Sequence, residues 1–204
     1  DKEYAISKIF KIVIKGLEER IAIEKSKKEI KNLRKINIQN LSESTILDRV
    51  DLSKKLSKEE YKERLDKAQK KLSKLQNQLY LKRTPVIIAF EGWDAAGKGG
   101  AIKRITEKMD PRGYCVNPIG APNDVEKNHH YLWRFWNRIP KAGHIAIFDR
   151  TWYGRVLVER VEKLATEEEW KRAYREINDM ESHLYNEGTI IIKFWIHIDK
   201  NEQA

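Results

Sequence analysis

A glycine-rich run in the middle of the sequence has the residue types and spacing of a phosphate-binding loop. The run Gly92-Trp93-Asp94-Ala95-Ala96-Gly97-Lys98-Gly99 fits the Walker A pattern G-x-x-x-x-G-K between a segment that reads as a strand and one that reads as a helix. Glycines permit the required backbone angles, N–H groups and the helix N-terminus attract phosphate oxygens, and the Lys98 ammonium neutralises their charge. We therefore predict a catalytic Lys98 and a phosphate-binding backbone. The backbone positions are Gly92, Ala95, Ala96, Gly97, Gly99 and Gly100.

Two aspartates have the chemistry and placement to hold a divalent cation. The loop ends in Gly99 rather than Ser or Thr, so it lacks the hydroxyl that ligates Mg²⁺ in many such loops, and Asp94 is the nearest replacement. Asp149 ends the apolar stretch His144–Phe148, which is the Walker B pattern. A carboxylate at that strand end can bind Mg²⁺ or orient an acceptor. We predict Mg²⁺ or Mn²⁺ on Asp94 and Asp149, both catalytic; a turn aspartate at 94 and a helix cap at 149 are the alternatives.

Several cations follow the two acidic sites. Arg150 comes directly after Asp149, and this strand-Asp-Arg arrangement is similar to nucleoside monophosphate kinases of the thymidylate kinase type. Phosphoryl transfer needs fixed positive charge around the transferred group, and arginine supplies it in bidentate form. We predict a catalytic Arg150 and further phosphate or nucleotide contacts. These are Arg104, Asn123, Arg134, Arg155 and Arg160. The alternatives are a solvated helix face for Arg104, core aromatics around Arg134, and structural ion pairs for Arg155 and Arg160.

Strands and helices alternate in residues 85–204. This alternation predicts an α/β fold with a mostly parallel sheet and helices on both faces. The predicted strands are Val86–Phe90, Tyr114–Ile119, His144–Phe148 and Thr189–Ile198. The predicted helices are 98–108, Val125–Ile139, and a long one that starts at the capping box Thr166–Glu169 and ends near Asn186.

Residues 1–84 are different in character. They carry a net charge of +10, whereas residues 85–204 are neutral, and most of their cations are lysines typical of solvated faces. Apolar residues at helical spacing over 5–22, and again after a capping box at Ser57–Glu60, predict two helices that pack on a core or a partner. A membrane-surface helix over 5–22 is disfavoured by Glu18 and Glu19. Residues 37–56 show no clear period.

The composition excludes several classes of protein. A single cysteine excludes an intrachain disulfide framework and a multi-cysteine zinc site. Cys115 falls in a predicted buried strand, where it would be inert, and His129 and His130 are adjacent, so they point apart on a helix. No signal peptide is recognisable, and no apolar run approaches the ~20 residues that span a bilayer. We expect a cytoplasmic protein with an anionic partner.

Three motifs in order resemble the second polyphosphate kinase family. They are the run Phe90–Gly100, the run Tyr131–Trp136, and the run Phe148–Arg160. The resemblance covers about residues 50–203 and implies a P-loop kinase fold, a three-layer α/β/α sandwich, with Mg²⁺-dependent transfer between inorganic polyphosphate and nucleotides. It implies metal and acceptor-orienting roles for Asp94 and Asp149, and phosphate contacts from Lys98, Arg104, Arg150 and Arg155. Gly99 is normal for this family.

The sequence Glu91-Gly92-Trp93 is similar to the subgroup of polyphosphate:AMP phosphotransferases, some of which are tandem proteins. The run Asp51–Tyr61 resembles the approach to the second copy. We expect residues 1–48 to be a helical extension or linker and residues 49–204 to be a kinase domain that stops before a lid and a terminal helix. The expected partners are polyphosphate and AMP or ADP, with homo-oligomer or tandem-domain packing.

Two other functions remain open at this point. One is an ATP-dependent nucleoside monophosphate kinase, which would use the same loop and Asp-Arg strand end. The other is a basic helical module that binds nucleic acid or a partner, attached to a degenerate kinase domain. The intact lysine and both carboxylates argue against degeneracy.

Overall fold

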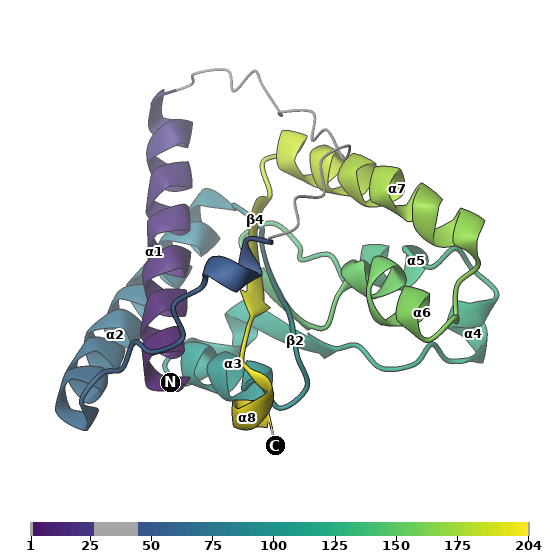
Figure 1. Cartoon of the computed structure of the whole chain (residues 1–204). Coiled ribbons are helices and arrows are strands. Elements are labelled where there is room, and N and C mark those ends of the chain that lie inside the picture. Colours follow the sequence, from purple (N-terminus) through teal and green to yellow (C-terminus); the bar gives the residue numbers. More distant parts are fainter. Residues whose placement is uncertain (1, 27–44, 204) are drawn as a thin grey trace.

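The chain folds around a four-stranded parallel sheet with helices on both faces (Figure 1). The structure is a computed structural model that describes residues 2–26 and 45–203. The strands are β1 Val86–Gly92, β2 Tyr114–Pro118, β3 Ile145–Asp149 and β4 Ile190–Ile196, in the order β2-β3-β1-β4. The α/β fold and the parallel sheet predicted from the sequence are confirmed. Residues 37–44, where the sequence shows no period, lie outside the described residues.

Strand β1 lies in the centre of the sheet because its residues are apolar on both faces. Val86 to Phe90 are all buried, and they pair with β3 on one side and β4 on the other. Strand β4 alternates instead, with Lys193 and Trp195 exposed between buried neighbours, which is the pattern of a strand that is covered on one face.

One face of the sheet is covered by three helices. They are α1 Lys2–Ser26, α2 Lys58–Lys82 and α3 Lys98–Thr106. Figure 1 shows α1 and α2 side by side, and α1 also packs on β4. The apolar stripe of α1, including Phe10, Val13 and Leu17, belongs to the same buried cluster as Ile88 and Phe90 of β1. Both predicted N-terminal stripes are therefore core. No helix in the described parts of the chain combines the length and apolar character needed to cross a membrane.

The other face is covered by helix α7 Glu167–Asn186 and by short elements. These are α4 Asp124–Lys127, α5 Trp133–Trp136, α6 Val158–Val161 and the 3₁₀ helix η3 Trp152–Val156. The predicted capping box at Thr166 is confirmed, since its side chain accepts from the Glu169 N–H and Glu169 returns the bond. The remaining short helices are η1 Leu47–Arg49, η2 Pro111–Gly113 and α8 Lys200–Gln203.

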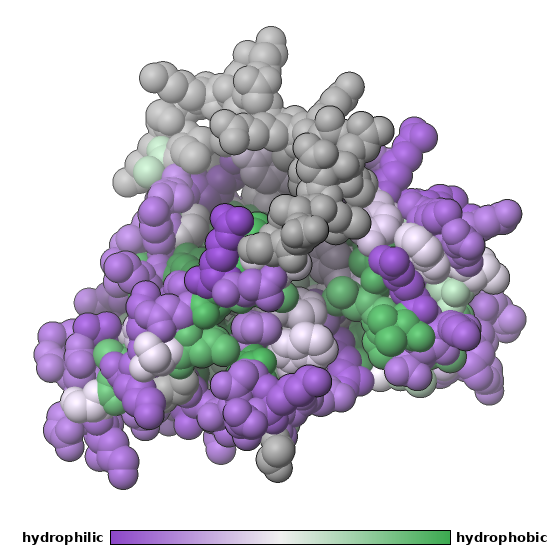
Figure 2. Space-filling model, in the orientation of Figure 1, coloured by the Kyte–Doolittle hydropathy of each residue, from purple (hydrophilic) through white to green (hydrophobic). Residues whose placement is uncertain are grey.

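Figure 2 shows that hydrophilic side chains cover most of the visible face. An apolar patch lies over the α6 region, where Val158, Val161 and Leu164 are exposed (Figure 2).

Two predictions about local structure are wrong. Residues Val125–Ile139 do not form one helix: α4 ends at Lys127 and α5 starts at Trp133. The Asn128 side chain donates to the Asp124 carbonyl, so it caps the end of α4 and the chain turns there. Cys115 is exposed rather than buried, because β2 is an edge strand of the described sheet and pairs with β3 alone.

The strand order creates a crevice between the ends of β1 and β3. After β1 the chain enters α3 on one face of the sheet, and after β3 it enters η3 and α7 on the other face. The two loops therefore diverge at the carboxyl ends of neighbouring strands. Such a switch point is where ligands bind in open parallel sheets.

Candidate active site

The glycine-rich loop joins β1 to α3 at this switch point. Gly92 has a φ of +135°, and a Cβ placed on it would lie 2.1 Å from the Ile196 carbonyl oxygen, so the position admits only glycine. Gly97, with a φ of +93°, is the N-cap of α3. Trp93 ties the loop to the end of β4, because its Nε1 donates to His197 Nδ1 at 3.0 Å. The loop is therefore held between two neighbouring strand ends.

Lys98 lies at the start of α3, with 8% of its surface exposed. Its ammonium donates to the carbonyl oxygens of Gly92 and Trp93, each at 2.8 Å. These two bonds use two of the three N–H donors of an ammonium group and hold the charge beneath the loop. The lysine is thus positioned by the loop itself, before any ligand arrives.

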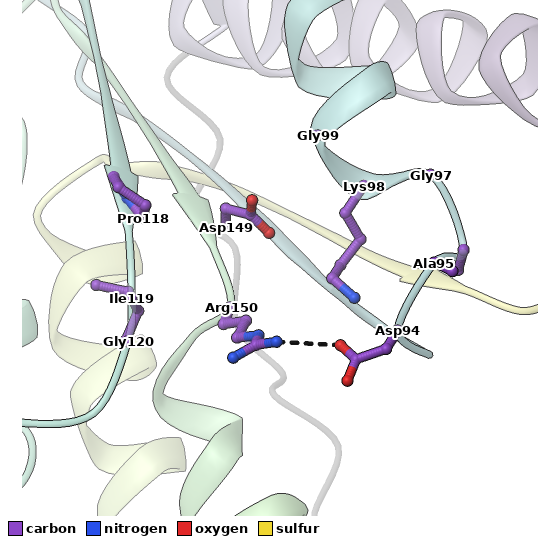
Figure 3. Close-up of a pocket in the computed structure, with 11 residues that line it drawn as sticks. Asp94, Ala95, Gly97, Lys98, Gly99, Pro118, Ile119, Gly120, Asp149 and Arg150 are labelled. Carbon is purple, nitrogen blue, oxygen red and sulfur yellow. Dashed lines mark hydrogen bonds and ion pairs between the residues drawn. The ribbon is translucent and has the colours of Figure 1, made fainter.

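A pocket of about 490 Å³ lies between the two diverging loops. Its lining comes from the phosphate loop, the end of β2 and the end of β3. The lining residues are Asp94, Ala95, Ala96, Gly97, Lys98, Gly99, Pro118, Ile119, Gly120, Asp149 and Arg150. Figure 3 shows the Lys98 and Asp149 side chains directed toward the same space. The four residues predicted to be catalytic therefore line one pocket.

An ion pair spans the mouth of this pocket. Arg150 Nη2 lies 3.0 Å from Asp94 Oδ1, which links the loop after β1 to the turn after β3 (Figure 3). The two side chains are 54% and 79% exposed, respectively. An ion pair this exposed contributes about 0–1 kcal/mol, so a ligand phosphate can replace the carboxylate at little cost.

The pocket suits a cation that is shared with a phosphate ligand. Among the described residues, no group of three or more His, Cys, Asp or Glu side chains could hold a metal by itself. Asp94 and Asp149 both line the pocket, and Mg²⁺ typically binds through one or two carboxylates together with substrate phosphates. The two carboxylates present fit that mode of binding.

Of the predicted backbone contacts, Gly92 and Gly100 are absent from the pocket lining. The predicted side-chain contacts outside the catalytic four are absent from it as well. Arg104 folds back along α3, where its Nη1 donates to the Gly100 carbonyl at 3.0 Å. Asn123 caps α4: its side chain accepts from the Glu126 N–H, and Glu126 accepts from the Asn123 N–H. Both side chains therefore have local structural partners.

The three remaining arginines also have partners. Arg134 lies 3.3 Å from the buried carboxylate of Glu126. Arg155 pairs with Glu159 at 3.2 Å and lies over the Tyr131 ring at 4.4 Å. Arg160 lies 4.1 Å from the centre of the Trp170 ring. Each of these three guanidinium groups therefore contacts a carboxylate or an aromatic ring outside the pocket lining.

The sequence reading missed four residues at or beside the site. Pro118, Ile119 and Gly120 form the β2 side of the pocket, and only the strand order reveals that β2 ends there. Glu91 accepts hydrogen bonds from the Thr151 N–H and hydroxyl at 2.7 and 2.8 Å. Burial raises the pKa of the Glu91 carboxyl above its ordinary value, although the Thr151 bonds act to lower it. The sequence signal that could have identified Glu91 is a glutamate at the end of an apolar strand.

These features define the class of protein. A parallel sheet with a Walker A loop at its switch point and a Walker B aspartate on the adjacent strand is the P-loop kinase fold. The family profile "Polyphosphate kinase 2 (PPK2)" matches residues 55–204. The chain belongs to the polyphosphate kinase 2 family.

Known proteins of this family resemble the chain over most of its length. A polyphosphate:AMP phosphotransferase of Pseudomonas syringae pv. tomato is 43% identical over 203 residues, which are 100% of this chain and 41% of that protein. A polyphosphate:AMP phosphotransferase of Acinetobacter johnsonii is 62% identical over 119 residues, 58% of this chain and 25% of that protein. The chain therefore spans less than half the length of these relatives.

A solved structure confirms the fold. The crystal structure of a polyphosphate kinase 2 from Pseudomonas aeruginosa PA01 superposes with a TM-score of 0.74 and 49% identity, over 76% of this chain and 34% of that chain.

Proposed function

We propose that the chain carries the active site of a phosphotransferase that moves a phosphoryl group from inorganic polyphosphate to AMP and so forms ADP. The observation that supports this is the convergence of Lys98, Asp94, Asp149 and Arg150 on one pocket at the end of the phosphate loop. The substrates come from the names of the relatives. The catalytic unit in this proposal is residues 49–204, with residues 1–48 as a helical extension whose α1 docks on β4.

The mechanism is an in-line transfer. The loop N–H groups and Lys98 bind the phosphates around the reacting group, and Arg150 stabilises the charge on its equatorial oxygens. An AMP phosphate oxygen attacks the terminal phosphorus of polyphosphate, the bridging P–O bond breaks, and the donor leaves one phosphate shorter. The AMP phosphate has a second pKa of about 6, so most of it is doubly ionised at pH 7. Its attacking oxygen therefore needs no general base. Asp149 therefore acts by orienting the acceptor.

Asp94 and Asp149 are the residues that would hold Mg²⁺. When bound, the ion supplies charge neutralisation between neighbouring phosphates. Arg150 pairs with Asp94 in this structure through an exposed ion pair, and a phosphate of the substrate can replace that carboxylate.

The test is ADP formation from AMP and polyphosphate with Mg²⁺. The Pseudomonas aeruginosa polyphosphate:AMP phosphotransferase serves as the positive control. Lys98→Met keeps the buried stem and removes the ammonium, and we expect turnover to fall about 10²-fold or more. Its melting temperature, measured alongside, separates this loss from the cost of the two hydrogen bonds to Gly92 and Trp93. Undiminished turnover in this variant would contradict the assignment of the loop. Replacing polyphosphate by ATP as donor tests the nucleoside monophosphate kinase alternative, which predicts activity with ATP alone.

A further inference from the structure

The turn that follows β3 has to be held in an unfavourable conformation. Arg150 has a φ of +67°, in the left-handed region that non-glycine residues seldom adopt. The β1–β3 ladder ends at the pair Phe90–Asp149, and the Arg150 N–H still reaches the Phe90 carbonyl at 3.0 Å. Glu91 and Gly92, the last two residues of β1, are paired only with β4, which runs along the other side of β1. The bond from Arg150 is therefore the last backbone bond from the turn to β1, and the next N–H, that of Thr151, has to find another partner.

The Glu91 side chain takes over where the ladder stops. One carboxylate oxygen, Oε1, accepts both the N–H and the hydroxyl of Thr151, at 2.7 and 2.8 Å. Thr151 is buried, and its hydroxyl oxygen also accepts the Tyr153 N–H at 3.1 Å, which starts η3. Glu91 thus fixes the residue after Arg150 and, through the threonine hydroxyl, the beginning of η3.

We propose that Glu91 is a positioning residue of the phosphotransfer site: its carboxylate holds the turn Asp149–Thr151 so that the Arg150 guanidinium faces Asp94 across the pocket. This inference rests on the proposed function for the identity of the reaction. Glu91 is absent from the lining of the pocket that holds Lys98 and Asp149, and it lines a separate hollow beside Tyr153 and Lys193. Its contact with the phosphotransfer site runs through Thr151. Asp94 and Glu91 are three residues apart. Asp94 holds the Arg150 side chain, and Glu91 holds the next residue, Thr151.

The rival roles for Glu91 are a general base and a metal ligand, and both need the charge of the carboxylate. Positioning needs only an acceptor oxygen at Oε1. Glu91→Gln keeps that oxygen, whereas Glu91→Ala removes it. The pair Thr151→Ser and Thr151→Val repeats the comparison from the donor side, because serine keeps the hydroxyl and valine keeps the shape alone.

The experiment measures kcat and KM for AMP and polyphosphate on the full chain, together with amide hydrogen exchange of the peptide that covers residues 150–156. We expect Glu91→Gln and Thr151→Ser to keep kcat within about threefold and to leave the pH profile unchanged. We expect Glu91→Ala to lower kcat about 10–100-fold, more than it changes KM, and to speed exchange of this peptide. Thr151→Val should have the same effects to a lesser degree, and should add little to Glu91→Ala because the two share one contact.

Three outcomes would overturn the proposal. Glu91→Gln could be as inactive as Glu91→Ala, which would show that the reaction needs the charge of the carboxylate. Glu91→Ala could retain the wild-type kcat. Exchange of residues 150–156 could be unchanged in Glu91→Ala, or, if that variant does not fold, in Thr151→Val. Exchange needs no turnover, so it still decides the role of Glu91 if the unaltered chain fails to convert AMP, a result that would count against the proposed function alone.

Discussion

Replacing Gly92 with alanine tests how closely the phosphate loop is built against β4. The added Cβ would lie 2.1 Å from the Ile196 carbonyl oxygen and 2.7 Å from the Ile196 nitrogen, both of them backbone atoms that no side-chain rotation can move away. The backbone at position 92, with a φ of +135°, is also unfavourable for any L residue. Strain of this kind costs about 1–3 kcal/mol, and overpacking adds about 1–3 kcal/mol. We expect Gly92→Ala to lower the free energy of unfolding by about 2–6 kcal/mol.

Two other glycines separate strain from clash. Gly188 follows α7 with a φ of +90° and has open space around its Cβ position, so Gly188→Ala should cost only the strain, about 1 kcal/mol. Gly99, in the first turn of α3, has neither a positive φ nor a neighbour within 4 Å. Gly99→Ala should change the free energy of unfolding by less than about 1 kcal/mol, in the stabilising direction.

Urea unfolding and thermal unfolding of the three variants provide the measurement. For a chain of this length about 2–4 °C of melting temperature corresponds to 1 kcal/mol, so Gly92→Ala should melt about 4–24 °C lower than the unaltered chain. If Gly92→Ala proved no more harmful than Gly188→Ala, the close approach of the β1 and β4 backbones would not be a rigid feature, and the argument that only glycine fits there would fail.

Three further predictions concern charged side chains. Arg150→Lys keeps the charge but loses the planar fork; we expect turnover in the ADP assay to fall about 10–100-fold with little change in melting temperature, and wild-type turnover would contradict this. Burial acts to raise the pKa of Glu126, but hydrogen bonds from the Asn123 N–H and Arg138 and the charge of Arg134 lower it overall. The ionised carboxylate is thus stabilised by folding, a contribution present above its ordinary pKa of 4.5 and lost as the pH falls below it. The melting-temperature advantage over Glu126→Gln should therefore shrink between pH 6 and pH 3.5, and a constant advantage would refute the linkage. Glu181 accepts from Trp152 Nε1, the Tyr153 hydroxyl and Lys193 Nζ, so Glu181→Ala should destabilise by about 2–4 kcal/mol in urea unfolding, whereas an effect below 1 kcal/mol would show that water replaces it.

The sequence was sufficient wherever the controlling interactions are local. The phosphate loop requires glycines and a lysine at fixed spacing, the caps at Ser57 and Thr166 each join residues three apart, and the stripe of α1 repeats with the helical period. The strand that ends in Asp149 could also be predicted from its apolar residues, since a buried parallel strand needs apolar residues on both faces. Each of these patterns is set by chemistry within about twenty residues.

Long-range pairing was beyond the sequence. Arg150 pairs with Asp94, 56 residues away, and Thr151 donates to Glu91, 60 residues away. Neither segment contains a sequence pattern that identifies the other. The exposure of Cys115 depends on β2 lying at an edge of the described sheet, which is a property of strand order. The break after Lys127 depends on one side-chain cap that competes with a continuous apolar pattern.

The amino-acid sequence by itself determined the chemical groups and the family, because a phosphate loop, a Walker B aspartate and their helices are specified by neighbouring residues. Only the tertiary structure decided how those groups meet. The sheet order puts β1 beside β3, so their loops diverge around one pocket, and packing assigns Glu91 to the turn that carries Arg150. The physical reason is that a contact between distant segments is fixed by the burial and hydrogen bonding of the whole sheet, and no single segment contains that information.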